Sequence, residues 1–400
     1  MARPIIATID IGSSSIKGIV CQKLEDKNQY QILAHCVLKS EGVRRGAVVD
    51  PQKTAEIIEK IKSRLEALAR IRIKNVLVNI GGHHIFIKPV KGAVAISRAD
   101  QKVSQEDIER VLDEARAVSL PLNKEVLEIY PREYIIDEEK GIKDPLGLRG
   151  IKLEMEGIVT CVFSPYLKNL KEAVLSADLN IIDVLPSPLA DAYALLTPQQ
   201  KELGVVLIDI GAGTTSMAVF EEGQLIHLAI FPGGSSNISN DIAIALKTEI
   251  DIAKKIKEEF GKLIFSKTNR KEKLKLDSGE VFVFSTKDFS KAARARIEQI
   301  FDHIKKELKK ISKYGKLPAG VVLTGGGSKI PGLVDYAKKE LSLPVRLGKL
   351  NNFIGPHLDE RFSVACGLAV FGLEEGEKEE EGMFSKIAQM LRKFLEILKP

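Results

Sequence analysis

The chain has 400 residues, 44% of them hydrophobic and 28% charged, with a formal charge of +6. This length allows two or three domains with sizeable cores. The modest positive charge is not accompanied by a basic patch interleaved with aromatic residues, so nucleic acid is not an expected partner. The four cysteines form no CxxC pair, which favours a reduced, cytoplasmic setting. No apolar run reaches about 18 residues, so we expect no membrane-spanning helix.

A hairpin with a small-residue turn is predicted at the N-terminus. Residues 5–11 form an apolar strand that contains Asp10, a turn follows at Gly12, and a second apolar strand begins near Ile16. Such a turn leaves the carboxylate beside backbone N–H groups that no bulky side chain covers. The N–H groups suit a phosphate, and the carboxylate suits a water-shelled magnesium ion. One hairpin alone is weak support, because glycine turns after strands are common.

The next part of the chain interrupts the alternation of strands and helices. After strand 30–39, helix 51–70 and strand 75–80, one helix and three strands are predicted, which indicates a small α+β module inserted into the first domain. Ser104 and Asp107 make a plausible capping start for its helix. The elements of the module are expected at residues 88–96, 104–117, 125–137 and 151–163.

A second hairpin repeats the first nearly two hundred residues later. Helix 165–176, strand 181–185 and a connecting helix at 186–196 precede it. The apolar strand 205–210 contains Asp209, and a small-residue turn and a second strand follow. Two copies in matching register predict a nucleotide held from both sides.

A triple glycine completes the predicted site. Helical, Lys-rich segments at 238–262 and 287–313 lead to strand 321–324, which runs into three glycines. A backbone without side chains can lie flat against an adenosine. In order and spacing, the two hairpins and this triple glycine resemble the actin–hexokinase–chaperone ATPase superfamily, which implies ATP and Mg2+ as ligands.

Each residue of these three elements can be given an expected role. Asp10 and Asp209 would hold magnesium through water, Asp209 is the candidate catalytic base, and Lys17 would be the point charge on the phosphates. The remaining contacts are expected from Gly12, Ser13, Ser14 and Ser15 in the first turn, from Gly211, Gly213, Thr214 and Thr215 in the second, and from Gly325, Gly326, Gly327 and Ser328 beside the adenosine.

The C-terminal region changes character after Gly372. The glutamate-rich residues 374–382 predict a disordered acidic linker, and residues 383–400 predict an amphipathic helix with a basic polar face. A terminal helix docked on the protein's own core is the alternative, but the acidic linker and the basic face favour an anionic membrane surface. The membrane contacts would come from Phe384, Ile387, Leu391, Phe394, Leu395 and Leu398, with Lys386, Arg392 and Lys393 beside the headgroups.

The assembled parts resemble the FtsA family of bacterial cell-division proteins over nearly the whole length. The inserted module carries the most discriminating motifs, Pro131-Arg132-Glu133, Asp144-Pro145-Leu146-Gly147 and Leu153-Glu154. The resemblance implies an α/β fold of the actin-like, duplicated ribonuclease-H type, ATP binding and polymerisation into filaments. It also implies tethering of the FtsZ ring to the cytoplasmic side of the inner membrane at the division site, and recruitment of later division proteins.

The resemblance also gives expected domain boundaries. They are 1–84 with 163–203 for domain 1A, 85–162 for the inserted module 1C (SHS2-like), 204–231 with 318–373 for domain 2A, 232–317 for subdomain 2B, 374–382 for the linker and 383–400 for the membrane helix.

Two departures from the superfamily pattern bear on chemistry. Members that hydrolyse ATP well place Gln or Glu in the connecting helix, whereas this chain has Ser187 there, and Asp191 is expected to lie too far along. Slow turnover is therefore expected. The helix before residue 257 has Lys254 and Lys255 where a Glu that contacts ribose is common.

A docking site for the C-terminal peptide of FtsZ is expected on the basic helix 287–313. Arg294 and Arg296 are the candidates for binding its carboxylates, although a solvated basic face explains them equally well.

Three other functions fit the sequence less well. A small-molecule kinase of the same superfamily needs a substrate pocket with its own base, which the sequence does not indicate. A PilM-type pilus assembly protein shares the fold and a related insertion but normally lacks the amphipathic tail. MreB-type filaments lack the inserted module.

Overall fold

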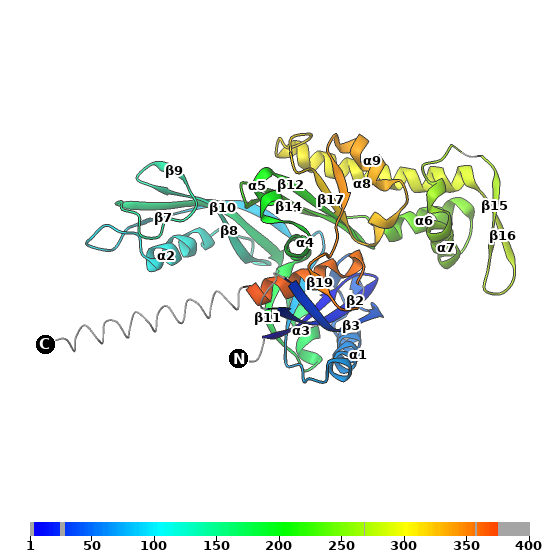
Figure 1. Ribbon diagram of the computed structural model, residues 1–400, viewed down its shortest axis with the longest axis horizontal. Coiled ribbons are helices and arrows are strands. Elements are labelled where there is room, and N and C mark those ends of the chain that lie inside the picture. Colours follow the sequence, from blue (N-terminus) through cyan, green and yellow to red (C-terminus); the bar gives the residue numbers. More distant parts are fainter. Residues whose placement is uncertain (1–3, 25–28, 268, 357, 375–400) are drawn as a thin grey trace.

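The computed structural model describes residues 4–24, 29–267, 269–356 and 358–374. Two large sheets lie at the centre, a smaller sheet with one helix extends at one end, and a two-stranded ribbon lies at the other (Figure 1). Within the described ranges, no helix is both long enough and apolar enough to cross a bilayer. The predicted amphipathic helix 383–400, with all its proposed membrane contacts, lies outside the described residues, as does the predicted linker beyond residue 374.

The first large sheet has the strand order β11-β6-β1-β2-β3-β19. β1 and β2 are the first predicted hairpin, β3 continues it antiparallel, and β6 and β11 extend it in parallel on the other side of β1. Six of the seven residues of β1 are buried, as a central strand requires. The strands span Ile5–Ile11 (β1), Ser15–Leu24 (β2), Gln29–Lys39 (β3), Asn75–Ile80 (β6), Asn180–Pro186 (β11) and Phe353–Ile354 (β19).

The second large sheet repeats this topology. Its order is β14-β13-β12-β17-β18, with β12, β13 and β14 antiparallel and with β17 and β18 added in parallel. The duplication predicted from the two hairpins is therefore present in the whole sheet. The strands span Val205–Ile210 (β12), Thr214–Glu221 (β13), Gln224–Pro232 (β14), Val321–Thr324 (β17) and Val345–Leu347 (β18).

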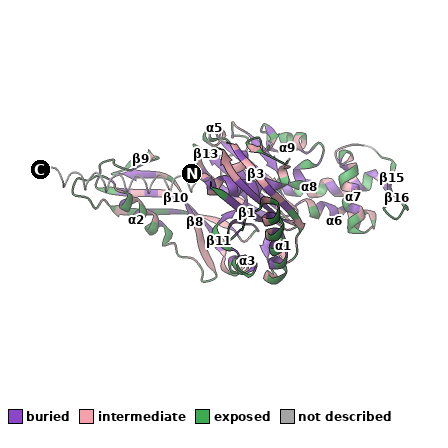
Figure 2. Cartoon of the chain, turned by 60° about the horizontal axis from the view of Figure 1, so that its bottom comes forward, coloured by how far each residue is buried: buried purple, intermediate pink, exposed green. Residues whose placement is uncertain are grey.

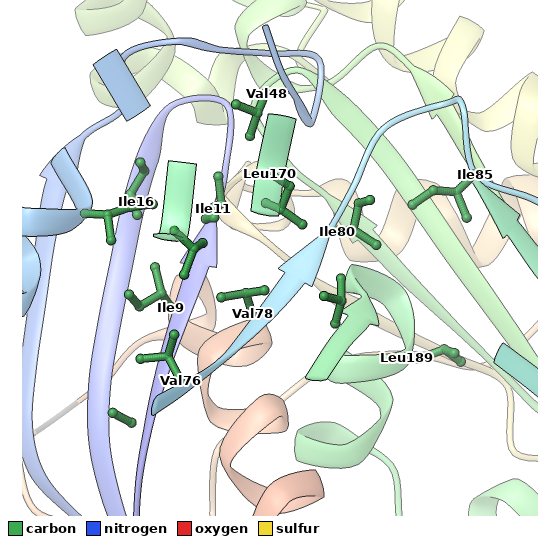
Figure 3. Close-up of a cluster of buried hydrophobic side chains, with 14 of the residues drawn as sticks. Ile9, Ile11, Ile16, Val48, Val76, Val78, Ile80, Ile85, Leu170 and Leu189 are labelled. Atoms are coloured by element: carbon green, nitrogen blue, oxygen red, sulfur yellow. The ribbon is translucent and has the colours of Figure 1, made fainter. Parts of the chain in front are cut away.

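A continuous hydrophobic core connects the two domains. Figure 3 shows Ile9 and Ile11 of β1 near Val78 and Ile80 of β6, and the same cluster extends to Leu207 of the second sheet. In Figure 2 the buried residues concentrate in the strands, and the helices expose one face. The helices around this core are α1 (Pro51–Ala69), α3 (Ser164–Ser176), α4 (Ser187–Leu195), α5 (Pro198–Leu203) and the helical residues 363–374.

The inserted module is a four-stranded antiparallel sheet covered by one helix. The predicted capping box is present, because Ser104 and Asp107 exchange side-chain to backbone hydrogen bonds at the start of α2. The Nζ of Lys143 lies 3.2 Å from a carboxylate oxygen of Glu202 on α5, so the module also contacts the second half of the chain. Its elements are β7 (Phe86–Ala95), α2 (Gln105–Arg116), β8 (Lys124–Ile136), β9 (Glu139–Ile142) and β10 (Lys152–Phe163), in the order β7-β10-β8-β9.

The remaining elements surround one end of the second sheet. The helical segment predicted at 238–262 is two helices, because Lys247 adopts a left-handed conformation that ends the first. His83 and His84 lie in the turn between β6 and β7. The remaining bounds are β4 (Val43–Arg44), β5 (Ala47–Val48), α6 (Ser235–Leu246), α7 (Ile250–Phe260), η1 (Gly261–Leu263), β15 (Lys271–Lys275), β16 (Val281–Ser285), α8 (Thr286–Lys310), η2 (Gly326–Lys329), α9 (Leu333–Leu341) and η3 (Glu360–Phe362).

Candidate functional site

A cavity of about 650 Å³ lies between the two large sheets. The turns of both predicted hairpins line one part of it, and α6, α7 and the turn after β17 line the rest. The sequence therefore predicted correctly that these three distant segments meet. From the predicted set the cavity is lined by Asp10, Gly12, Ser13, Ser14, Ser15, Lys17, Asp209, Gly211, Thr214, Gly325 and Gly326.

The first hairpin holds a buried ion pair. The Nζ of Lys17 donates to Oδ2 of Asp10 at 2.6 Å, directly across the β1–β2 register. Asn79 at the end of β6 donates to Oδ1 of Asp10 at 2.9 Å and accepts from the backbone N–H of Ile11 at 2.6 Å. Lys17 is thus the charge partner of Asp10 rather than a free cation, and Asn79 is a site residue that the sequence analysis missed. The sequence feature that could have identified Asn79 is its position near the carboxyl end of a predicted strand.

The second hairpin lacks such a pair. Asp209 lies opposite Ser216, and the Oγ of Ser216 is buried without a hydrogen-bond partner. Burial and then the negative charge of Asp10 raise the pKa of Asp209 to about 7, while Lys17 opposes this shift. A Cβ on Gly325 would lie 1.9 Å from Oδ1 of Asp209, so only glycine allows the turn after β17 to approach this carboxylate.

A third buried carboxylate, that of Asp191, interacts electrostatically with Asp209 and Asp10. Its side chain on α4 is fully buried, and neither carboxylate oxygen has a hydrogen-bond partner. Burial raises its pKa well above the ordinary value, the charges of Asp209 and Asp10 add to the shift, and Ser363 and Lys17 oppose it. Asp191 does not line the cavity, in keeping with the expectation that it lies too far along α4 to orient a water there.

Four of the predicted contact residues do not line the cavity. The hydroxyl of Thr215 points away and donates to the carbonyl of Gly233 at 2.8 Å, and that of Ser328 donates to the carbonyl of Gly325 at 2.7 Å. These two side chains therefore stabilise the turns that line the cavity. Gly213 packs against Ser13 of the opposite hairpin, and Gly327 packs against Ile210.

Another part of the cavity wall contains charged residues of α7. Lys254, Lys257 and Glu258 line it, whereas Lys255 is paired with Asp277 outside. Glu258 brings a carboxylate to the cavity wall, four residues beyond Lys254 on the same helix. Burial lowers the pKa of Lys257 to about 8, and its Nζ donates to the carbonyl and the hydroxyl of Ser235.

The carboxylates suit a metal held through water. In the described part of the chain, no group of three or more His, Cys, Asp or Glu side chains could ligate a metal ion directly. Asp10, Asp209 and Ser216 nevertheless line the cavity, and the buried hydroxyl of Ser216 has no hydrogen-bond partner. A hydrated magnesium ion fits this arrangement, and it would neutralise part of a triphosphate's charge there.

The two arginines predicted to receive a peptide already have partners within the chain. The guanidinium of Arg296 forms two contacts with the carboxylate of Asp241, at 2.6 and 3.1 Å. Arg294 donates to the carbonyls of Ile264 and Ser266. Both side chains are only partly exposed, whereas the prediction placed them on a basic face of the helix that is open to a peptide.

Comparison with solved structures defines the class of protein. The chain is similar to a protein of the PilM–PilN type IV pilus biogenesis complex, with a TM-score of 0.68 and 17% identity, covering 93% of this chain and 99% of that one. It is also similar to MreB5 of Spiroplasma citri bound to ADP, with a TM-score of 0.57 and 13% identity, covering 95% and 99%. The chain thus has the actin-like two-domain fold with an inserted α+β module, as predicted.

Sequence relatives define the family within this class. Family models described as "Cell division protein FtsA" and "SHS2 domain inserted in FTSA" match residues 206–367 and 82–161. FtsA of Pseudomonas aeruginosa is 33% identical over 96% of this chain and 92% of its own length. FtsA of Bacillus subtilis is 31% identical over 92% and 83%. The chain belongs to the FtsA family of cell division proteins.

Proposed function

We propose that this chain binds ATP with Mg2+ between its two hairpins and acts mainly as a scaffold that polymerises and links FtsZ to the membrane. The observation that carries the proposal is the meeting of two carboxylate-bearing glycine turns and a third glycine turn around one cavity. Membership of the FtsA family supports the role in cell division.

The phosphates would lie between the two turns. The backbone N–H groups around Gly12 and Gly211 suit phosphate oxygens, and Asp10 and Asp209 suit the water shell of the magnesium ion. ATP turnover by the isolated chain should be well below the usual enzyme range of about 1–1000 per second. Ser187 cannot orient a water as a Gln or Glu would, and Asp209 is the candidate base.

Membrane attachment would come from residues 383–400. Their apolar side chains would enter the headgroup boundary, and their basic ones would contribute about 1 kcal/mol each near anionic lipid. One short helix binds reversibly, and a filament that presents many of them gains avidity by orders of magnitude. The protein would therefore lie at the cytoplasmic face of the inner membrane at the division site, where it recruits later division proteins.

The FtsZ peptide would dock on subdomain 2B along α8. Arg294 and Arg296 remain the proposed contacts, and the peptide's carboxylates would then compete with Asp241 for Arg296. Reversing both charges should abolish peptide binding in fluorescence anisotropy and leave ATP binding intact. Undiminished peptide binding would mean that the peptide binds elsewhere on the protein.

Sedimentation with anionic liposomes tests the tether directly. The full chain should pellet with the liposomes and carry FtsZ with it. Truncation after Gly382 should leave the protein in the supernatant with its ATP affinity unchanged, and Leu391→Glu should do the same. A truncated chain that still pellets would show that residues 383–400 are not the membrane anchor.

A further inference from the structure

One wall of the cavity is formed by a short segment that no sequence motif singled out. Residues 360–364 line the cavity here, across from α7 and beside the turn after β17. Among the described cations of this segment and its neighbours, Arg361 stands out because its guanidinium is fixed in place. Three contacts with one neighbouring carboxylate, that of Asp359, hold it.

Asp359 orients the Arg361 side chain. The Nε of Arg361 lies 3.0 and 2.9 Å from the two carboxylate oxygens of Asp359, and a terminal nitrogen lies 2.9 Å from one of them. Asp359 also accepts from Lys329 at 2.8 Å, so the carboxylate is itself fixed. The Arg361 side chain remains 58% exposed, which leaves the face of its guanidinium open.

The surroundings of Arg361 suit a flat base rather than a phosphate. Its aliphatic carbons lie 3.9 and 4.0 Å from where a Cβ on Gly326 would be, so the stem covers the bare backbone of this turn. Glu258 of α7 lines the same cavity, and its negative charge acts on Arg361. With Asp359 and Glu258 nearby, the guanidinium is partly neutralised and is a poor site for a phosphate.

We propose that Arg361 is a nucleotide-binding residue whose guanidinium plane, held by Asp359, stacks on the purine base. This inference rests on the proposed binding of ATP in the cavity, with the phosphates at the hairpins and the base between α7 and the turn after β17. A planar guanidinium stacks on aromatic rings, whereas the ammonium group of lysine offers only a point charge. Arg361 therefore contributes affinity for the base, and this contribution does not depend on the number of phosphates.

Calorimetry on the full chain tests this proposal with ATP, ADP, CTP and tripolyphosphate. Arg361→Ala should weaken ATP and ADP binding alike, by about five- to thirty-fold, and should reduce the preference for ATP over CTP. The affinity for tripolyphosphate, which has no base, should stay within about two-fold of the wild-type value. Arg361→Lys should not restore ATP binding, and Asp359→Asn, which frees the guanidinium, should fall between wild type and Arg361→Ala.

Arg270→Ala is the matched control, because this arginine also binds an acidic partner, Glu272, but lies outside the cavity. Its ATP affinity should equal that of the wild type. The proposal is overturned if Arg361→Ala binds ATP as the wild type does. It is also overturned if Arg361→Lys restores binding and tripolyphosphate affinity falls in parallel, because Arg361 would then act only as a charge. Failure of the wild-type chain to bind ATP would instead refute the proposed function.

Discussion

The two hairpins have the same topology and strand register but different electrostatics. In the first, Asp10 is paired across the hairpin with Lys17 and receives a further hydrogen bond from Asn79. In the second, the equivalent partner of Asp209 is Ser216, and burial raises the pKa of Asp209 to about 7. The duplicated backbone therefore carries one neutralised carboxylate and one uncompensated carboxylate. The comparison shows that the second hairpin is where a cation must be supplied from outside.

Lys17→Ala should have the largest effect, because it removes the charge balance of the first hairpin. The substitution leaves Asp10 unpaired and facing the triphosphate. We expect ATP affinity to fall about 10- to 150-fold, as for the loss of one charge-assisted contact. Isothermal titration calorimetry measures this loss. An unchanged affinity in both Lys17→Ala and Asp209→Ala would mean that the nucleotide binds elsewhere.

Replacing Asp10 and Asp209 with asparagine, one at a time, should change stability in opposite directions. Asp10→Asn breaks a buried ion pair and should lower the free energy of unfolding by about 3 kcal/mol. Asp209→Asn removes a carboxylate without a charge partner and should raise the melting temperature at pH 8. If both variants shift the melting temperature in the same direction, the two hairpins do not differ as described.

The pH dependence of stability follows from the raised pKa of Asp209. Between its ordinary pKa of 3.8 and about 7, the folded chain keeps a proton that the unfolded chain has lost. This contribution to stability is complete below the ordinary pKa and is lost as pH rises towards 7. Thermal melts of the wild type should show this decline from pH 5 to pH 8, and melts of Asp209→Asn should show less of it.

The second domain also places a lysine of α7, Lys257, in the cavity wall. Since burial lowers the pKa of Lys257 to about 8, its charge should be lost as pH rises from 7 to 9. ATP affinity should therefore fall a few-fold over this range, and Lys257→Arg should bind ATP equally well at both ends of it. A wild-type affinity that does not vary between pH 7 and pH 9 would exclude Lys257 from the site.

The smallest effect is expected at Ser216, the counterpart of Lys17. Its hydroxyl makes no hydrogen bond to the protein, so Ser216→Ala should change the free energy of unfolding by no more than about 0.5 kcal/mol. Chemical denaturation measures this difference. A loss of unfolding free energy as large as the one expected for Asp10→Asn would show that the hydroxyl has a structural partner.

The sequence predicted the three glycine-rich segments and their meeting, because strand patterns and turns are local properties. It did not predict how side chains pair across the site. The register that places Lys17 on Asp10, and the parallel pairing that brings Asn79 to Asp10, depend on contacts between strands. Arg296 was named as a candidate peptide contact, and its partner Asp241, which lies on another helix 55 residues away, was not foreseen. Long-range pairing of this kind leaves no periodic signal in one sequence.

The central claim is that a hydrated magnesium ion supplies the charge that the second hairpin lacks. Calorimetric titration of ATP into the wild type and into Asp209→Asn, each with Mg2+ and with a chelator, tests it most directly. We predict that Mg2+ strengthens ATP binding to the wild type and has little effect on the variant, which should bind metal-free ATP at least as tightly as the wild type does. Equal affinities of the wild type with and without Mg2+, or an undiminished Mg2+ effect in Asp209→Asn, would contradict the account.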